Sequence, residues 1–216
     1  MLIRSFNWFV KITAFIPQLL CFRTKIYYEN KKAQTRSIKG KAIIISNHRS
    51  VYDIAMMLFL FPTRTLHCLI AEIMFTKNAI FSLFLKALGG IKVDRNAHDF
   101  SFVEKSCKIL EKGGVIEIYP ESRLPRKDEA PPLQFTPSAA YIALLSGAPI
   151  IPVFTNGKYF TKERTRVIIG TPIDVRALYN DELSEQVNLR SISEYMRNKI
   201  IGLENELNKQ SKKEKK

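Results

Sequence analysis

The sequence has few cysteines, and their positions exclude two common classes of protein. Its 216 residues contain only three, Cys21, Cys68 and Cys107. Three is an odd number, and cysteines this far apart form neither a disulfide framework nor a CxxC zinc site. We therefore expect no metal site and three reduced thiols in a protein that faces the cytosol.

Acidic residues are also scarce. The chain has 34 Lys and Arg against 20 Asp and Glu, which gives a formal net charge of +14. The partners that such an excess favours are nucleic acid, an anionic membrane surface or acidic substrates. With 46% hydrophobic and 25% charged residues, the composition excludes a disordered or collagen-like chain. The length suits one compact domain with a full hydrophobic core.

The chain lacks a long uninterrupted hydrophobic run. Residues 2–22 are mostly apolar, but Lys11 and Pro17 interrupt them. A bilayer crossing needs about 18–20 clean apolar residues, so this segment is a poor transmembrane span. No small-residue cleavage site follows, which also argues against a signal peptide.

Polar residues in this segment follow a helical repeat. Arg4, Asn7, Lys11 and Gln18 form one stripe that repeats about every 3.5 residues, with large apolar side chains around it. Such a helix fits the headgroup plane of a membrane, with Trp8 as an interface anchor. The alternative is an N-terminal helix packed on the core and kinked at Pro17.

The rest of the chain alternates between strand-like and helix-like segments, which predicts an α/β fold with a mixed, mostly parallel sheet flanked by helices. Short β-branched runs predict strands, and apolar segments that end at glycine or proline predict helices. The expected strands are 41–46, 66–70, 91–93, 115–119, 150–154 and 166–169. The expected helices are 54–61, 73–88, 100–110, 138–145 and 191–207.

The most informative motif, Asn47-His48-Arg49-Ser50-Val51-Tyr52-Asp53, directly follows an expected strand. Open α/β sheets place their sites where a strand ends and a helix begins. Asp53 can fold back to accept the N–H of His48, which fixes the imidazole tautomer and suits a general base. Alternatively, His48 caps its own turn and Asp53 serves only the helix N-terminus. The spacing alone leaves both interpretations open.

Basic residues follow two further expected strands. They could form a cationic pocket for a phosphate, because guanidinium groups bind such oxygens bidentately. The alternative is that these side chains are exposed or paired with Asp94 and Glu121. The residues concerned are Arg95, Arg123, Arg126 and Lys127.

Four blocks in this order resemble the glycerolipid acyltransferase family, specifically the 1-acylglycerol-3-phosphate O-acyltransferases, over residues 40–175. Asn47, His48 and Asp53 match its Asn-His-x-x-x-x-Asp motif. The other blocks are Gly90–Arg95, Glu121–Arg123 and the apolar strand at residues 149–153. Where the family usually shows Glu-Gly-Thr-Arg, this chain has Glu121-Ser122-Arg123, with the arginine one residue nearer.

The resemblance implies an enzyme that needs no cofactor and moves a fatty acyl chain from acyl-CoA or acyl carrier protein to a lysophospholipid hydroxyl. It implies that His48 is the base and Asp53 its orienting partner. Asn47, Arg95, Glu121 and Arg123 would be substrate-binding residues. The altered third block leaves acceptors other than 1-acylglycerol-3-phosphate open, as well as a non-catalytic membrane-surface protein. The sequence shows none of the motifs of nucleic-acid-binding proteins.

We accordingly expect an N-terminal interfacial membrane-binding segment at residues 1–35, an acyltransferase domain at residues 36–207 and a basic disordered tail at residues 208–216. We expect the protein to be associated with the cytoplasmic face of a membrane, with the lipid surface, the thioester and the lysophospholipid as its partners.

Overall fold

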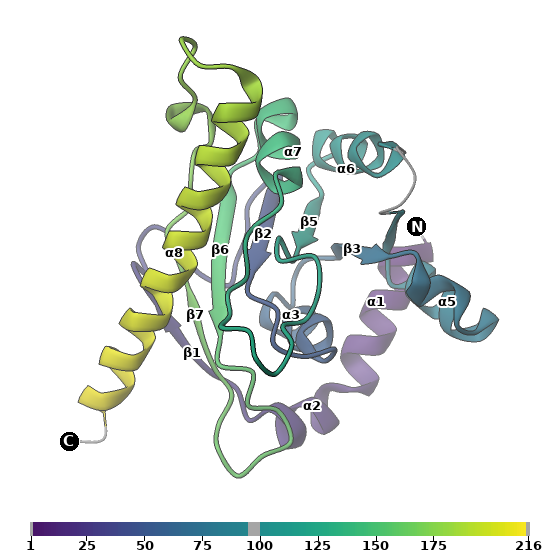
Figure 1. Ribbon diagram of the computed structural model, residues 1–216. Helices are drawn as coiled ribbons and strands as arrows, with labels where there is room; N and C mark the ends of the chain where they lie inside the picture. The colour runs from purple at the N-terminus through teal and green to yellow at the C-terminus, as the bar shows by residue number, and fades with distance from the viewer. Residues whose placement is uncertain (1, 95–99, 215–216) are drawn as a thin grey trace.

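The computed structural model describes residues 2–94 and 100–214. Over these residues the chain forms a seven-stranded sheet in the order β1-β7-β6-β2-β5-β3-β4 (Figure 1). Neighbouring strands run parallel except β6 and β7, which are antiparallel. The predicted fold class, α/β with a mixed and mostly parallel sheet, is confirmed.

The strands are short, and those in the middle of the sheet are buried on both faces, as their β-branched composition predicts. They are β1 (Lys25–Tyr28), β2 (Ala42–Ser46), β3 (Leu66–Ala71), β4 (Ile91–Val93), β5 (Val115–Ile118), β6 (Ile150–Thr155) and β7 (Arg166–Ile169). The helices are α1 (Leu2–Thr13), α2 (Phe15–Phe22), α3 (Asp53–Leu60), α4 (Ile73–Thr76), α5 (Ala79–Ala87), α6 (Ser101–Glu111), α7 (Ser138–Ser146) and α8 (Glu185–Lys213), with a 3-10 turn at Arg176–Leu178.

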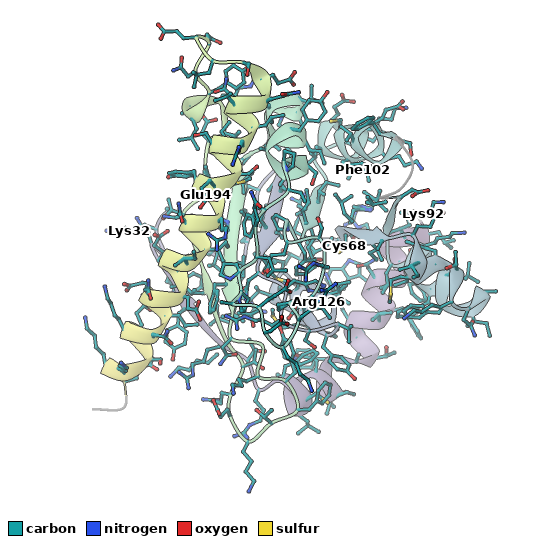
Figure 2. The ribbon with its side chains drawn as sticks, viewed as in Figure 1. Lys32, Cys68, Lys92, Phe102, Arg126 and Glu194 are labelled. Atoms are coloured by element: carbon teal, nitrogen blue, oxygen red, sulfur yellow. The ribbon has the colours of Figure 1, made fainter. Side chains whose placement is uncertain are left out.

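Helices cover both faces of the sheet, so the core lies in two main layers. On one face α6, α7 and α8 pack on alternate strand residues such as Ile43, Ile45 and Ile116. On the other face α3 and the end of α2 pack on the intervening residues, such as Ile44 and Val153. Figure 2 shows how side chains fill these layers: Cys68 of β3 lies near the middle of the molecule.

Three elements differ from the sequence prediction. Strand β1, which was not predicted, pairs with β7 and belongs to the main sheet, so the predicted boundary at residue 35 is wrong. The single helix expected at residues 73–88 is two helices, because Asn78 leaves the helical conformation and caps α5 through its side chain. Helix α8 continues to Lys213.

The predicted disordered tail is therefore wrong over residues 208–214. Ser211 is 7% exposed, and the Glu214 carboxylate accepts hydrogen bonds from Lys25 Nζ at 2.5 Å and from the Tyr27 hydroxyl at 2.7 Å. The lysine-rich composition suggested solvation, but the carboxyl end of α8 packs on the edge strand β1.

The N-terminal helices have the predicted polar stripe, but part of that stripe faces the protein. Asn7 is 1% exposed, and its amide donates to the carbonyl of Leu88 at 3.0 Å. The Lys11 amine donates to the carbonyls of Phe61, Pro62 and Arg64 at 3.3, 3.0 and 2.6 Å. The chain bends at Ala14, between α1 and α2, and Pro17 lies within the first turn of α2, where proline is tolerated.

Because polar groups hold α1 to the domain, most of the large apolar side chains of α1 and α2 point outward, with Phe22 at the end of α2 buried. These outward residues are between 36% and 81% exposed; they are Leu2, Ile3, Trp8, Phe9, Ile12, Phe15, Ile16, Leu19 and Leu20. Helix α5 lies beside α1, and Phe84 contacts Phe6 edge-on at 5.8 Å between ring centroids. Its Ile80 and Leu83 are 80% and 68% exposed. None of the described helices is long and apolar enough to cross a membrane.

Candidate active site

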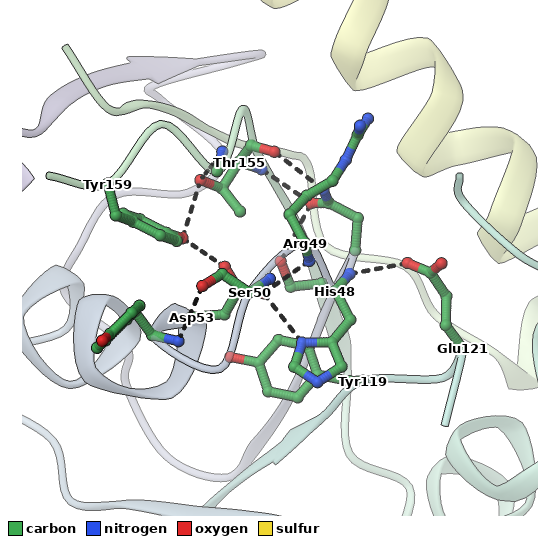
Figure 3. Close-up of polar contacts among 12 residues, drawn as sticks. His48, Arg49, Ser50, Asp53, Tyr119, Glu121, Thr155 and Tyr159 are labelled. Atoms are coloured by element: carbon green, nitrogen blue, oxygen red, sulfur yellow. Dashed lines mark hydrogen bonds and ion pairs between the residues drawn. The ribbon is translucent and has the colours of Figure 1, made fainter. Parts of the chain in front are cut away.

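The carboxyl end of β2 leads into a tight turn that brings His48 and Asp53 together (Figure 3). His48 Nδ1 lies 2.9 Å from Asp53 Oδ2, which is the contact that the first of the two interpretations requires. The same oxygen accepts the backbone N–H groups of Arg49 at 2.7 Å and Ser50 at 2.9 Å. Asp53 is also the first residue of α3, whose N-terminal dipole favours a negative charge. The aspartate therefore closes the turn and orients the imidazole at once.

The carboxylate of Asp53 is fully buried, whereas the His48 side chain is 17% exposed. With Asp53 accepting from Nδ1–H, the second ring nitrogen, Nε2, carries the lone pair. Among the described residues, none hydrogen-bonds Nε2. An imidazole in this state can accept a proton from a group that approaches its exposed edge.

Two residues of β6 and the loop after it complete the support of this turn. The Asn47 side chain and the Thr155 backbone exchange two hydrogen bonds of 2.9 Å, which clamp the end of β2 to the end of β6. The Tyr159 hydroxyl donates to Asp53 Oδ1, the oxygen that the turn itself leaves unused. Both carboxylate oxygens of Asp53 thus have protein donors, as a buried charge requires.

A buried pair from β5 lies beneath the imidazole. The Tyr119 ring stacks on His48, with ring centroids 4.4 Å apart and an angle of 30° between the planes. The Tyr119 hydroxyl donates to the carboxyl group of Glu117, which is 1% exposed. The pKa of Glu117 is raised to about 8, chiefly by burial; the Tyr119 hydrogen bond lowers it and the charge of Asp53 adds to the rise. This platform fixes the plane of the ring from the side opposite to solvent.

Glu121 belongs to the turn after β5 and holds two backbones in place. Its carboxylate accepts the N–H of His48 at 2.8 Å and that of Leu133 at 2.7 Å. The next residue, Ser122, has a φ of +62°, in the left-handed region that favours glycine. The serine thus keeps the backbone conformation that a glycine would adopt there.

These geometries agree with the comparison to known families. The sequence profile described as Acyltransferase matches residues 25–156. The chain belongs to the acyltransferase family. It is 28% identical over 136 residues to the 1-acyl-sn-glycerol-3-phosphate acyltransferase of Bacillus subtilis (strain 168). That match covers 61% of this chain and 65% of the relative, so the chain spans somewhat less than two thirds of the length of that relative.

The fold is also that of a solved acyltransferase structure. It matches the crystal structure of the 1-acyl-sn-glycerophosphate (LPA) acyltransferase PlsC from Thermotoga maritima with a TM-score of 0.63 and 18% sequence identity. The superposition covers 94% of this chain and 79% of that one. At this identity the match establishes the shared architecture.

The loop after β5 pairs its basic residues with a carboxylate, Glu129, that the sequence analysis did not name as their partner. Arg123 is bound bidentately by Glu129, with both N···O distances at 2.6 Å, so its guanidinium group already has a carboxylate partner. Glu129 also accepts the backbone N–H of Arg126 at 2.8 Å. Arg95 lies outside the described residues. The structure therefore brings together Asn47, His48, Asp53 and Glu121, with Arg123 held in the neighbouring loop.

The sequence did not identify Tyr119 and Tyr159 as supports of the turn that holds His48 and Asp53. Tyr159 lies 106 residues from Asp53 along the chain, and no local pattern connects them. Tyr119 was placed at the end of an expected strand, which is the right location, but its contact with His48 depends on the pairing of β2 with β5.

Proposed function

We propose that this protein transfers a fatty acyl chain from an acyl thioester, acyl-CoA or acyl carrier protein, to the free hydroxyl of a lysophospholipid at the cytoplasmic face of a membrane. The preferred acceptor is 1-acylglycerol-3-phosphate, and the product is then phosphatidic acid. The observation that carries this proposal is the His48–Asp53 pair, held at 2.9 Å with the free edge of the ring exposed. Membership of the acyltransferase family and the similarity to the 1-acyl-sn-glycerol-3-phosphate acyltransferase of Bacillus subtilis support it.

The geometry suits a reaction that needs no covalent acyl-enzyme. His48 Nε2 removes the proton of the acceptor hydroxyl as its oxygen attacks the thioester carbonyl. The tetrahedral intermediate collapses, the carbon–sulfur bond breaks, and the imidazolium returns the proton to the leaving thiolate. Asp53 stabilises the transient imidazolium and keeps the ring oriented, which is the role of a buried carboxylate on Nδ1.

The exposed apolar face of α1, α2 and α5 supports the membrane location. Soluble monomers rarely expose a contiguous patch of so many large apolar side chains. A bilayer surface is the partner that fits it, since both substrates carry long acyl chains and the net charge of +14 favours an anionic leaflet.

The block expected to bind the acceptor headgroup, Glu121–Arg123, is where this sequence differs from the usual pattern of the family. Arg123 would have to leave Glu129 before it could bind a phosphate. This pairing favours, as the second candidate, an acceptor other than 1-acylglycerol-3-phosphate, and the acceptor panel below separates the two.

The test of the reaction is a transfer assay in vesicles. The purified protein is given labelled acyl-CoA or acyl carrier protein with a panel of lysophospholipids that differ only in headgroup. We expect one acceptor to be acylated and His48→Ala to lower that rate by roughly 10²–10⁴-fold, the usual size of lost general-base catalysis. If no lysophospholipid accepts the acyl chain, or if the His48→Ala protein turns over normally, the proposed reaction is wrong.

The test of the membrane face is vesicle sedimentation. Ile12→Glu and Ile16→Glu place charges at positions that are 69% and 68% exposed, so they leave the core intact. We expect both to move the protein from the pellet of anionic vesicles to the supernatant. Val187→Glu, at an apolar position of α8 that is 49% exposed, is the matched control and should still sediment. Equal sedimentation of all three variants would contradict the proposed orientation.

A further inference from the structure

The second oxygen of the Asp53 carboxylate is held by a residue from a distant loop. Asp53 Oδ2 is occupied by its own turn, but Oδ1 accepts the hydroxyl of Tyr159 (Figure 3). Tyr159 is 7% exposed, and its hydroxyl also lies 3.3 Å from that of Thr155. Burial, followed by the charge of Asp53, raises the pKa of Tyr159 far above its ordinary value. The phenol thus stays protonated and remains a donor at any working pH.

The position of this hydroxyl is fixed from the membrane-facing side of the molecule. The Tyr159 ring packs edge-on against Phe22 at the end of α2, with ring centroids 5.4 Å apart. The loop that carries it is bound to the same helix end through the main chain. The N–H of Phe160 donates to the carbonyl of Cys21 at 3.1 Å, and the N–H of Thr165 donates to that of Phe22 at 3.3 Å.

We infer that Tyr159 is a positioning residue that, through its hydrogen bond to Asp53 Oδ1, sets how strongly the carboxylate draws a proton onto His48. This inference rests on the proposed function for its kinetic consequence. A carboxylate that shares its charge with a second donor stabilises the imidazolium less than a carboxylate without one. The hydroxyl therefore limits the negative charge that the carboxylate presents to the imidazole, and Tyr159→Phe removes that limit.

Within residues 2–94 and 100–214, the other ionisable groups around the pair do not supply a donor to Oδ1. From β5 and the turn after it, Tyr119 donates to Glu117, and Glu121 accepts from the His48 backbone. Cys68 of β3 is buried beside Glu117, and burial raises the pKa of its thiol. The Arg49 side chain turns away to Glu204 of α8, at 3.3 Å.

The test compares Tyr159→Phe with Tyr195→Phe, which makes the same change at an exposed position of α8. The chain has three histidines, so the imidazole proton resonances of His48 can be assigned with a His48→Asn variant and titrated by NMR. In Tyr159→Phe we expect the His48 titration midpoint to rise by about 0.5–1 pH unit, within the range of single hydrogen-bond effects. The acid limb of kcat/KM against pH should shift by the same amount, while Tyr195→Phe leaves both unchanged.

A purely structural role would lower the melting temperature of Tyr159→Phe but leave the midpoint where it is, and that result overturns the inference. If Tyr159→Phe does not fold, Tyr159→3-fluorotyrosine keeps the ring and strengthens the donor, so the midpoint must then fall; a fixed midpoint again overturns it. The titration does not require turnover. A shifted midpoint without any acyl transfer would refute the proposed function alone, and transfer with a fixed midpoint would refute the role of Tyr159 alone.

Discussion

Glu117 gives the sharpest prediction about stability, because it places a carboxyl group in the middle of the sheet. It lies on β5, in register with Ile44 of β2 and Cys68 of β3, and it is 1% exposed. Its described hydrogen-bond partner is the Tyr119 hydroxyl. Its pKa is raised from 4.5 to about 8: burial is the largest cause, the Tyr119 hydroxyl acts in the opposite direction, and the charge of Asp53 contributes to the rise.

The sign of the pH dependence follows from linkage. In the folded protein Glu117 keeps its proton at pH values where the unfolded chain has released it. Its contribution to stability is therefore complete below pH 4.5 and is lost as the pH rises through about 8. Each pH unit between the two pKa values corresponds to about 1.4 kcal/mol, so the free energy of unfolding can fall by at most about 5 kcal/mol over this interval.

Glu117→Gln tests this magnitude, because glutamine keeps an acceptor for Tyr119 but cannot ionise. At pH 5 we expect the free energies of unfolding of the variant and the wild type to agree within about 1 kcal/mol. As the pH rises to 8, the variant should become more stable than the wild type by several kcal/mol. The measurement is the free energy of unfolding in urea at a series of pH values. Glu182→Gln, an exposed position, is the control and should follow the wild type. A constant difference between Glu117→Gln and wild type across this range would refute the reasoning.

Two further predictions concern single positions. Ser122→Gly should raise the melting temperature, with a gain of about 1 kcal/mol or less, because glycine adopts the φ of +62° without strain; an unchanged or lower melting temperature would contradict it. Lys11→Met should remove the lysine donor from the carbonyls of Pro62 and Arg64 and one of two donors from that of Phe61, so amide hydrogen exchange in α1 should rise well above wild type, while exchange in α7 stays the same. Equal exchange in α1 would show that apolar contacts alone hold the helix.

The helices and strands that have a clear pattern in their own local sequence could be predicted. The β-branched run before His48 gave β2 nearly to the residue, and β7 was predicted with its observed bounds, Arg166–Ile169. Strand β1 was not predicted, because its four residues, Lys25–Tyr28, carry no alternation and its partner β7 lies about 140 residues away. The end of α8 was missed for a related reason: its packing on β1 is a tertiary contact that outweighs a composition typical of a solvated tail.

The site was predictable only where it is local. His48 and Asp53 lie within one turn, so their spacing allowed the contact to be put forward as one of two interpretations. The residues that hold this pair come from β5 and from the loop after β6. A single sequence does not show that these segments lie close to the end of β2 in space. Tyr119 and Tyr159 therefore could not be connected to the turn.

The N-terminal segment shows why an amphipathic pattern does not by itself give an orientation. The stripe predicted a helix with one polar and one apolar side, and either side could have faced the domain. The domain offers carbonyl groups at the end of α3 and after it, and the Lys11 amine fits them, so the polar side binds protein and the apolar side is left outward. The end of α2 then holds the loop of Tyr159, whose hydroxyl reaches Asp53. The helices that we propose to meet the bilayer therefore also hold the loop whose tyrosine binds the Asp53 carboxylate.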